Sequence, residues 1–202
     1  EGLRALTREH GALLIVDEVM TGFRLALGGA CERFNIDADL VCLGKIVGGG
    51  FPLAAFGGKA DVMGKLSPAG PVYQAGTLSG NPVAVAAGRA TLAQLNETMY
   101  DDLEAIGSEI EARLSDAVAK RGCSMTRVGS MFTIFFCDTP PSNFTQVSHC
   151  DMAAFGRFHR AALNHGVYLP PSQYEVAFLP AGLTPAEVDH LVAGLTASLS
   201  EA

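Results

Sequence analysis

The sequence predicts an α/β protein: a mostly parallel sheet with flanking helices, followed by a small α+β domain. Residues 12–16 and 40–43 are continuous apolar runs of strand length without alternation, a pattern typical of parallel strands covered on both faces. Hydrophobic residues make up 49% of the chain, charged residues 17%, and there are 23 glycines. This balance is typical of a globular protein with many tight turns.

Charge and cysteine content exclude several classes of function. The formal net charge of −7 argues against a nucleic-acid partner, and no apolar run approaches the roughly 20 residues of a membrane span. The cysteines are odd in number and have no CxxC spacing: Cys31, Cys42, Cys123, Cys137 and Cys150. We therefore expect reduced, mostly buried thiols, no metal site and a cytoplasmic location.

The first part of the chain predicts a helix and then a strand that ends in carboxylates. Residues 1–10 have the pattern of the end of an amphipathic helix, stopped at Gly11, so we expect this chain to be a piece of a longer protein. The strand over residues 12–16 is followed by Asp17 and Glu18. These carboxylates either bind a ligand at the carboxyl end of the sheet or cap the next turn.

Lys45 follows the second apolar run and precedes three glycines and a proline. The pattern alone leaves two interpretations. The commoner one is a solvated lysine on a turn after a strand. The other is a partly desolvated amine that can form a Schiff base. One helix-containing crossover fits between the two strands, so we expect Asp17 and Lys45 on neighbouring strand ends.

The following residues predict short elements and one long loop. We expect a third strand at residues 53–56 and a helix at residues 60–66. Residues 67–82 are too long and too rich in glycine and proline for a plain connection, and their hydroxyls and amides could bind phosphate. Asn81 and Pro82 then predict the start of a buried helix that is rich in alanine and valine.

The second half predicts a separate domain. We expect a helix over residues 102–121 with Asp101 as its cap, and its apolar stripe comprises Leu103, Ile106, Ile110, Leu114 and Val118. Strands are expected at residues 131–136, 167–169 and 176–179, and helices at residues 152–165 and after Thr184. The predicted domains are residues 1–98 and residues 99–202.

Five stretches of the sequence resemble a known family. Residues 14–24 (LIVDEVMTGFR) and 43–52 (LGKIVGGGFP) resemble the class III aminotransferases, which are pyridoxal-phosphate enzymes of fold type I. Residues 68–82 (PAGPVYQAGTLSGNP), 129–132 (GSMF) and 166–175 (GVYLPPSQYE) resemble the glutamate-1-semialdehyde aminomutase subfamily. The resemblance implies that residues 1–98 are the carboxyl-terminal part of the cofactor-binding large domain, and that the small domain follows.

The resemblance also implies roles for residues at the two strand ends. Pyridoxal 5′-phosphate would be the cofactor, and Lys45 would form its Schiff base and later move a proton on the substrate. Asp17 would hold the proton on the pyridine nitrogen, which makes the ring an electron sink. Val19 would pack against the ring.

Three further residues match the family pattern elsewhere in the chain. Gly76 and Thr77 would bind the phosphate of the neighbouring subunit's cofactor, which implies a homodimer with shared active sites. Glu175 would lie on the substrate side of the cofactor.

The implied activity is an intramolecular amino transfer that converts glutamate 1-semialdehyde into 5-aminolevulinate for tetrapyrrole biosynthesis. One alternative is an ω-aminotransferase that uses a separate amino acceptor, and another is an inactive truncated copy. The family's phosphate loop and substrate-carboxylate arginine would lie upstream of Glu1. We therefore expect the 202-residue chain by itself to be inactive.

Overall fold

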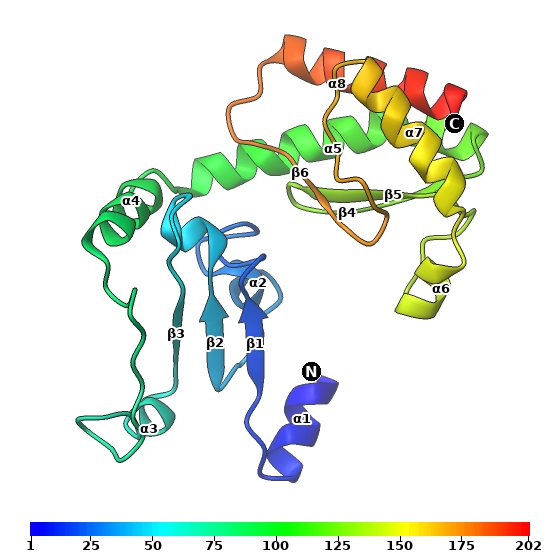
Figure 1. Ribbon diagram of the computed structural model, residues 1–202. Coiled ribbons are helices and arrows are strands. Elements are labelled where there is room, and N and C mark those ends of the chain that lie inside the picture. Colours follow the sequence, from blue (N-terminus) through cyan, green and yellow to red (C-terminus); the bar gives the residue numbers. More distant parts are fainter. The chain divides into compact units, whose positions relative to one another are not determined.

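The computed structural model describes all residues, Glu1–Ala202, as two compact units, Glu1–Glu97 and Thr98–Ala202 (Figure 1). In chain order the first unit contains α1 (Gly2–Glu9), β1 (Ile15–Glu18), α2 (Gly29–Arg33), β2 (Leu40–Leu43), the 3₁₀ helix η1 (Lys45–Gly48), β3 (Ala55–Gly58), α3 (Ala60–Met63) and α4 (Pro82–Leu92). Helix α5 (Glu97–Lys120) begins at the boundary. The second unit continues with β4 (Ser124–Val128), β5 (Met131–Phe135), α6 (Phe144–Ser148), α7 (Met152–Asn164), β6 (Ala177–Phe178) and α8 (Pro185–Glu201).

This mixture of helices and sheets confirms the predicted α/β class. None of the helices combines the length and the apolar character that a membrane crossing requires.

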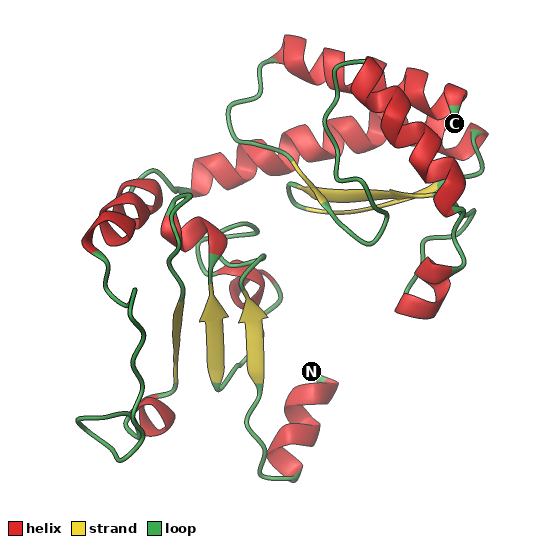
Figure 2. Ribbon diagram, in the orientation of Figure 1, coloured by secondary structure: helices red, strands yellow, loops and turns green.

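The first sheet has the order β1-β2-β3 (Figure 2). Strands β1 and β2 are parallel, and α2 lies on the crossover between them, as the sequence predicts. Strand β3 is antiparallel to β2, with Ala55 opposite Leu43. The connection from β2 to β3 contains only a short 3₁₀ helix, whereas a parallel return requires a crossover of a dozen or more residues.

Strand β1 begins later in the chain than its apolar run predicts. The Leu14 amide donates to Asp39 Oδ2 at 2.7 Å, and the Leu14 carbonyl accepts from the amides of Asp39 and Leu40. These bonds join Leu14 to the start of β2, and the regular ladder begins one residue later, at Ile15. The expectation of a strand covered on both faces is wrong for these 202 residues, because Leu13 is 52% exposed and Ile15 is 56% exposed.

Asp39 anchors the amino-terminal end of β2. It accepts hydrogen bonds from Arg4 Nη1 at 2.7 Å and from Lys59 Nζ at 2.8 Å, in addition to the Leu14 amide. The bonds from Lys59, Leu14 and Arg4 hold the pKa of the Asp39 carboxyl well below its usual range. This cluster ties α1 and the end of β3 to the sheet, at the opposite end of β2 from Lys45.

Helix α4 begins at its predicted cap but is not buried as predicted. The Asn81 side chain accepts from the amides of Val83 and Ala84, which confirms the cap. Only Ala84 and Gly88 are buried, whereas Val83 is 58% exposed. One stripe of the helix packs on η1, where a Cβ on Gly88 would lie 2.2 Å from the carbonyl oxygen of Val47.

Helix α5 begins at Glu97, earlier than the sequence predicts. Asp101 therefore lies inside the helix, and the predicted cap at this residue is wrong. The predicted stripe is confirmed, because its members are buried or partly buried in the core of the second unit. Phe132 and Ile134 of β5 belong to the same cluster as residues of α5, α7 and α8, so these helices pack on one face of the second sheet.

The second sheet is antiparallel, with the order β4-β5-β6. Gly129, at φ +58°, makes the tight connection from β4 to β5. Strand β6 is shorter than predicted. The strand predicted at residues 167–169 is absent: Val167 and Leu169 are buried, but the Leu169 carbonyl bonds to His159 Nε2 at 3.0 Å instead of to a neighbouring strand. The predicted capping box at Thr184 and Glu187 is confirmed.

Candidate functional site

The carboxyl ends of β1 and β2 lie at one edge of the first sheet (Figure 1). In the parallel register Asp17 is opposite Cys42 and Glu18 is opposite Leu43. Leu43 ends β2, Gly44 comes next, and Lys45 follows Gly44. The structure therefore brings the predicted carboxylate and the predicted amine to the same sheet edge, where α/β sheets bind ligands.

Lys45 has a strained backbone and an unpaired ammonium. Its φ is +50°, a left-handed conformation that costs a residue with a Cβ about 1–2 kcal/mol. It is the first residue of η1, after the extended Gly44. Its side chain is exposed and forms no ion pair, in contrast to Lys59, which contacts Asp37 and Asp39. Strain of this kind concentrates at ligand sites.

Asp17 and Val19 are joined by a hydrogen bond in the turn that follows β1. Asp17 Oδ1 accepts from the Val19 amide at 2.9 Å, which restrains the carboxylate at the end of the strand. A Cβ on Gly44 would lie 3.0 Å from Val19 Cγ1, so the Val19 side chain packs directly against the backbone that precedes Lys45. Asp17, Val19 and Lys45 are thus linked through one turn and one glycine. The exposed Asp17 side chain is open to a ligand.

Glu18 has a different role from Asp17, although the sequence pattern groups the two. Glu18 is only 1% exposed and accepts from Thr21 Oγ1, the Ala30 amide and the Cys31 amide. Burial alone would raise the pKa of the Glu18 carboxyl, but these hydrogen bonds lower it below the ordinary value of 4.5. Gly29, at φ +68°, allows the approach, because a Cβ there would lie 2.4 Å from Glu18 Oε2.

Glu18 therefore orders the crossover after β1 and does not face a ligand. The sequence contains a signal for this difference: adjacent residues of a strand point to opposite faces, so Asp17 and Glu18 cannot both face the same ligand.

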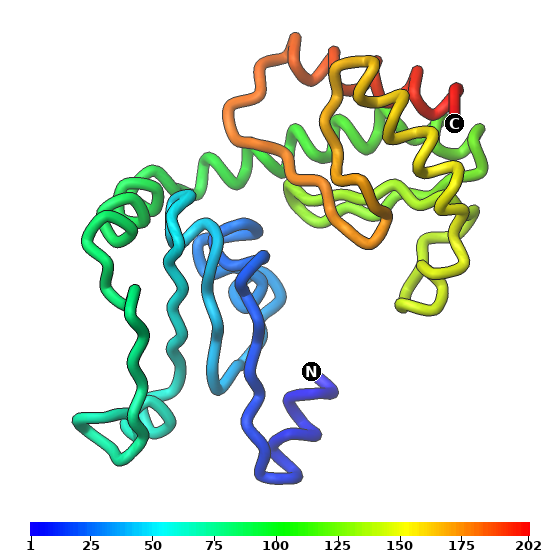
Figure 3. Tube along the Cα trace, in the orientation of Figure 1, coloured from blue at the N-terminus to red at the C-terminus, as the bar shows by residue number.

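A hollow of about 660 Å³ lies beside the same turn. Its lining includes Val19, Leu43, Phe56 and Gly76. In the backbone trace, the segment that contains Gly76 runs beside β3 (Figure 3). The Gly76 carbonyl accepts from the Ser79 amide at 3.0 Å, which makes a turn at this position. Thr77 is exposed, and its hydroxyl forms no hydrogen bond within the chain.

Glu175 belongs to the second unit, in the turn that precedes β6. Its amide donates to the Ser172 carbonyl at 3.1 Å, and its carbonyl accepts from Thr133 Oγ1 at 3.1 Å. The backbone is therefore held on both sides. The side chain is exposed and its carboxylate has no partner in the chain.

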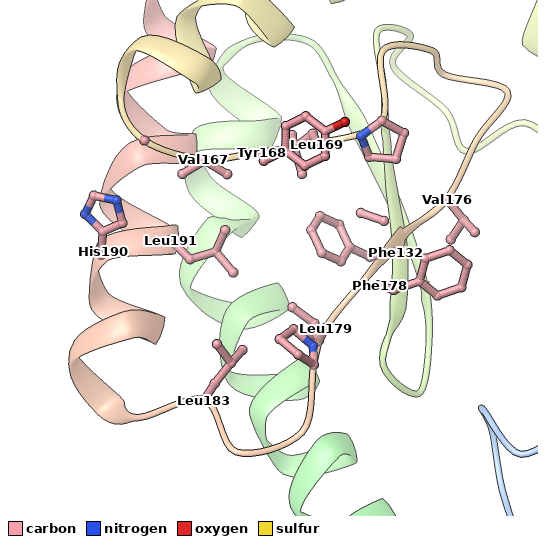
Figure 4. Close-up of a pocket in the computed structure, with 14 residues that line it drawn as sticks. Phe132, Val167, Tyr168, Leu169, Val176, Phe178, Leu179, Leu183, His190 and Leu191 are labelled. Carbon is pink, nitrogen blue, oxygen red and sulfur yellow. The ribbon is translucent and has the colours of Figure 1, made fainter. Parts of the chain in front are cut away.

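A second hollow, of about 500 Å³, lies in the second unit between residues 166–170, β6 and α8 (Figure 4). Its wall is mostly apolar, with Phe132, Leu179 and Leu191 turned toward it and His190 at its rim. None of the predicted site residues lines this pocket.

Comparison with known proteins gives the family. Residues 1–199 match the family model for aminotransferase class III. The chain is 49% identical over 204 residues to glutamate-1-semialdehyde 2,1-aminomutase of Anaeromyxobacter sp. (strain K), with 100% of this chain and 47% of that protein covered. It is 51% identical over 197 residues to the aminomutase of Sorangium cellulosum, with 96% of this chain and 45% of that protein covered. The chain thus spans about half the length of the curated relatives it matches.

Solved structures agree with this family. An ω-transaminase from Sphaerobacter thermophilus has a TM-score of 0.91 at 31% identity, covering 99% of this chain and 47% of that one. A glutamate-1-semialdehyde aminomutase from Pseudomonas aeruginosa PAO1, in complex with PMP, has a TM-score of 0.86 at 26% identity, with the same coverage. This chain belongs to the class III aminotransferase family.

Proposed function

We propose that a protein of the relatives' full length containing this chain is a pyridoxal-phosphate-dependent aminomutase. It converts glutamate 1-semialdehyde into 5-aminolevulinate, a step of tetrapyrrole biosynthesis. The observation that supports the proposal is the sheet edge that carries both Asp17 and the strained, unpaired Lys45. The names of relatives at 48–51% identity support the choice of substrate.

The residues at this edge fit pyridoxal phosphate. The cofactor needs an amine for its aldehyde, a carboxylate for its ring nitrogen and an apolar surface for its ring. Lys45, Asp17 and Val19 supply these groups from one turn and two strand ends. When bound, the cofactor acts as an electron sink that stabilises negative charge on the carbon bearing the amine.

Each residue then has a distinct task. Lys45 binds the cofactor, and its free amine moves a proton at the substrate carbon once the substrate has taken its place. Asp17 would hold the ring nitrogen of the cofactor, and the hydrogen bond from the Val19 amide restrains its carboxylate for this role. Glu175 lies toward the substrate in this proposal, supported by its exposed carboxylate and its restrained backbone.

Gly76 and Thr77 are proposed to bind the cofactor phosphate of a second subunit. Both residues are exposed, and the Thr77 hydroxyl has no partner in its own chain. The full-length protein would therefore be a homodimer with shared sites, and we also propose that it is cytoplasmic. In this proposal residues 1–98 are the carboxyl-terminal part of the cofactor-binding domain, and residues 99–202 are the small domain.

The direct test offers glutamate 1-semialdehyde to the full-length protein without any amino acceptor. We expect 5-aminolevulinate to form, and Lys45→Ala to abolish it. A matched control is Lys65→Ala, which removes an exposed lysine of the same unit and should leave the rate unchanged. Absence of product from the pyridoxamine form of the intact enzyme would rule out the aminomutase.

One observation favours a second candidate, a class III ω-aminotransferase with a separate amino acceptor. The TM-score is higher for the ω-transaminase than for the aminomutase structure, 0.91 against 0.86. The same assay separates the two candidates, because an ω-aminotransferase produces an aminated acceptor only when an acceptor is added. An inactive copy would give neither product.

A further inference from the structure

Two free cysteines of the second unit have their sulfur atoms in contact. Cys137 follows β5 and is partly exposed, whereas Cys150 precedes α7 and is buried. The Cys150 thiol donates to Cys137 Sγ across 3.1 Å. A disulfide has a sulfur–sulfur distance of about 2.05 Å, so bond formation requires an approach of about 1 Å.

The backbone next to both cysteines is already joined. The Asp151 amide, next to Cys150, donates to the carbonyl of Phe136, next to Cys137, at 3.1 Å. This bond joins the two backbone segments that carry the cysteines without help from the sulfur atoms. Oxidation would therefore add a covalent link to an existing contact and would not need to bring distant segments together.

The two thiols differ in a way that sets the order of reaction. Burial, with the Cys137 hydrogen bond, raises the pKa of the Cys150 thiol to about 12, so Cys150 is not the first nucleophile. Cys137 is partly exposed and is therefore reached first. Cys123 is also buried, and burial raises the pKa of its thiol to about 11, so it is not the first nucleophile either; unlike Cys150, it has no hydrogen bond to Cys137 Sγ.

The residues next to the two cysteines also bind the side chain of Gln173, which lies in the turn before Glu175. Gln173 is 1% exposed; its Oε1 accepts from the Phe136 amide at 2.7 Å and its Nε2 donates to the Asp151 carbonyl at 3.3 Å. Next to it, the Tyr174 ring stacks on Phe144 of α6, with 5.4 Å between centroids. Helix α6 lies inside the segment that a disulfide would close.

We propose that Cys137 and Cys150 form a reversible oxidation site, and that their disulfide locks the segment between them against the turn of Gln173. The oxidant is a peroxide of the hydrogen peroxide class. Cys137 sulfur takes one oxygen atom and becomes a sulfenic acid, and one water leaves. Cys150 sulfur then attacks Cys137 sulfur, and the hydroxide leaves with the Cys150 proton as a second water. Small-molecule thiols reverse the bond by exchange.

The first test needs neither cofactor nor substrate, so its result does not depend on the proposed function. The reduced 202-residue chain is treated with hydrogen peroxide and digested without reductant. We expect a cross-linked peptide pair containing Cys137 and Cys150, which dithiothreitol separates. Cys123→Ser should retain the cross-link, whereas Cys137→Ser and Cys150→Ala should both lose it.

Two outcomes would overturn the oxidation site. One is a Cys123–Cys137 cross-link in the wild-type chain. The other is oxidation of Cys137 to a sulfinic acid without any cross-link. Both are read on the wild-type chain, so they stand even if a cysteine variant fails to fold.

The lock is tested by amide hydrogen exchange of the oxidised and reduced chains. We expect exchange at the amides of Phe136 and Glu175 to slow by about tenfold on oxidation, because local opening becomes rarer. Exchange in α8 is the internal control and should not change. Equal exchange at Phe136 in the two states would overturn the lock. That this turn also carries a substrate-side glutamate rests on the proposed function.

Discussion

At the residue scale, Lys45 combines a strained backbone with an unpaired charge. Its positive φ is a conformation that glycine adopts without strain. We expect Lys45→Gly to raise the free energy of unfolding by about 1 kcal/mol while it removes cofactor attachment. Urea unfolding of the 202-residue chain measures the first effect.

Lys65→Gly is the matched control for this substitution, because the Lys65 backbone has a negative φ. There the added freedom of the unfolded chain should lower stability. A Lys45→Gly variant that is destabilised as much as Lys65→Gly would contradict the strain at Lys45.

Glu18 is the second residue with a testable energetic role. Glu18→Gln replaces a carboxylate that accepts three hydrogen bonds by an amide that satisfies fewer of them, and should cost about 1–3 kcal/mol at pH 7. Because the folded pKa lies below the ordinary value of 4.5, the stabilisation is present above pH 4.5 and is lost as pH falls through the folded pKa.

Urea unfolding at a series of pH values checks this prediction. The difference between wild type and Glu18→Gln should shrink as pH falls below 4.5. A difference that grows as the solution becomes more acidic would show that the sign is wrong.

At the element scale, two helix starts show where a local sequence pattern predicts a cap correctly and where it does not. Thr184 and Asp101 both have a glutamate three residues later, but only Thr184 is a cap in the structure. Thr184→Ala should destabilise the chain by about 1 kcal/mol, whereas Asp101→Ala should leave the free energy of unfolding nearly unchanged. Thermal unfolding measures both, and an equal loss in the two variants would place a cap at Asp101.

Local patterns predict correctly those features whose signal lies within a few residues of the sequence. The α5 stripe and the Asn81 cap are of this kind. The parallel β1–β2 pair is predicted from two local apolar runs and the length of the crossover between them. The misses depend on long-range bonds. Asp39 accepts from Leu14 across the sheet and moves the start of β1, and residues 167–169 bond to a helix instead of a strand.

The candidate site follows the same rule. The apolar runs and the residues after them predict that Asp17 and Lys45 meet, since parallel strands end at one edge. The positive φ of Lys45 could not be predicted, because it depends on the turn after Gly44. Strand alternation indicates that Glu18 and Asp17 point to opposite faces, but the hydrogen bonds that bury Glu18 depend on Gly29 and the crossover. The Cys137–Cys150 contact could not be predicted either, because the two residues have no CxxC spacing and are brought together only by folding.

At the scale of the whole molecule, the proposal of shared sites predicts complementation between two inactive variants of the full-length protein. Lys45→Ala lacks the amine, and Thr77→Asp places a negative charge against the phosphate. In a symmetric dimer each hybrid has one intact site, so mixing the subunits should restore about a quarter of the wild-type activity. Activity that stays at zero in verified hybrids would show that the sites are not shared.

The central claim is that Lys45 binds the cofactor. It is tested most directly by borohydride reduction of the full-length protein with pyridoxal phosphate, followed by mass mapping of the modified peptide. The account predicts a single pyridoxyl group on Lys45, lost in Lys45→Ala and retained in Lys59→Ala and Lys65→Ala. A pyridoxyl group on another lysine, with Lys45 unmodified, would contradict it.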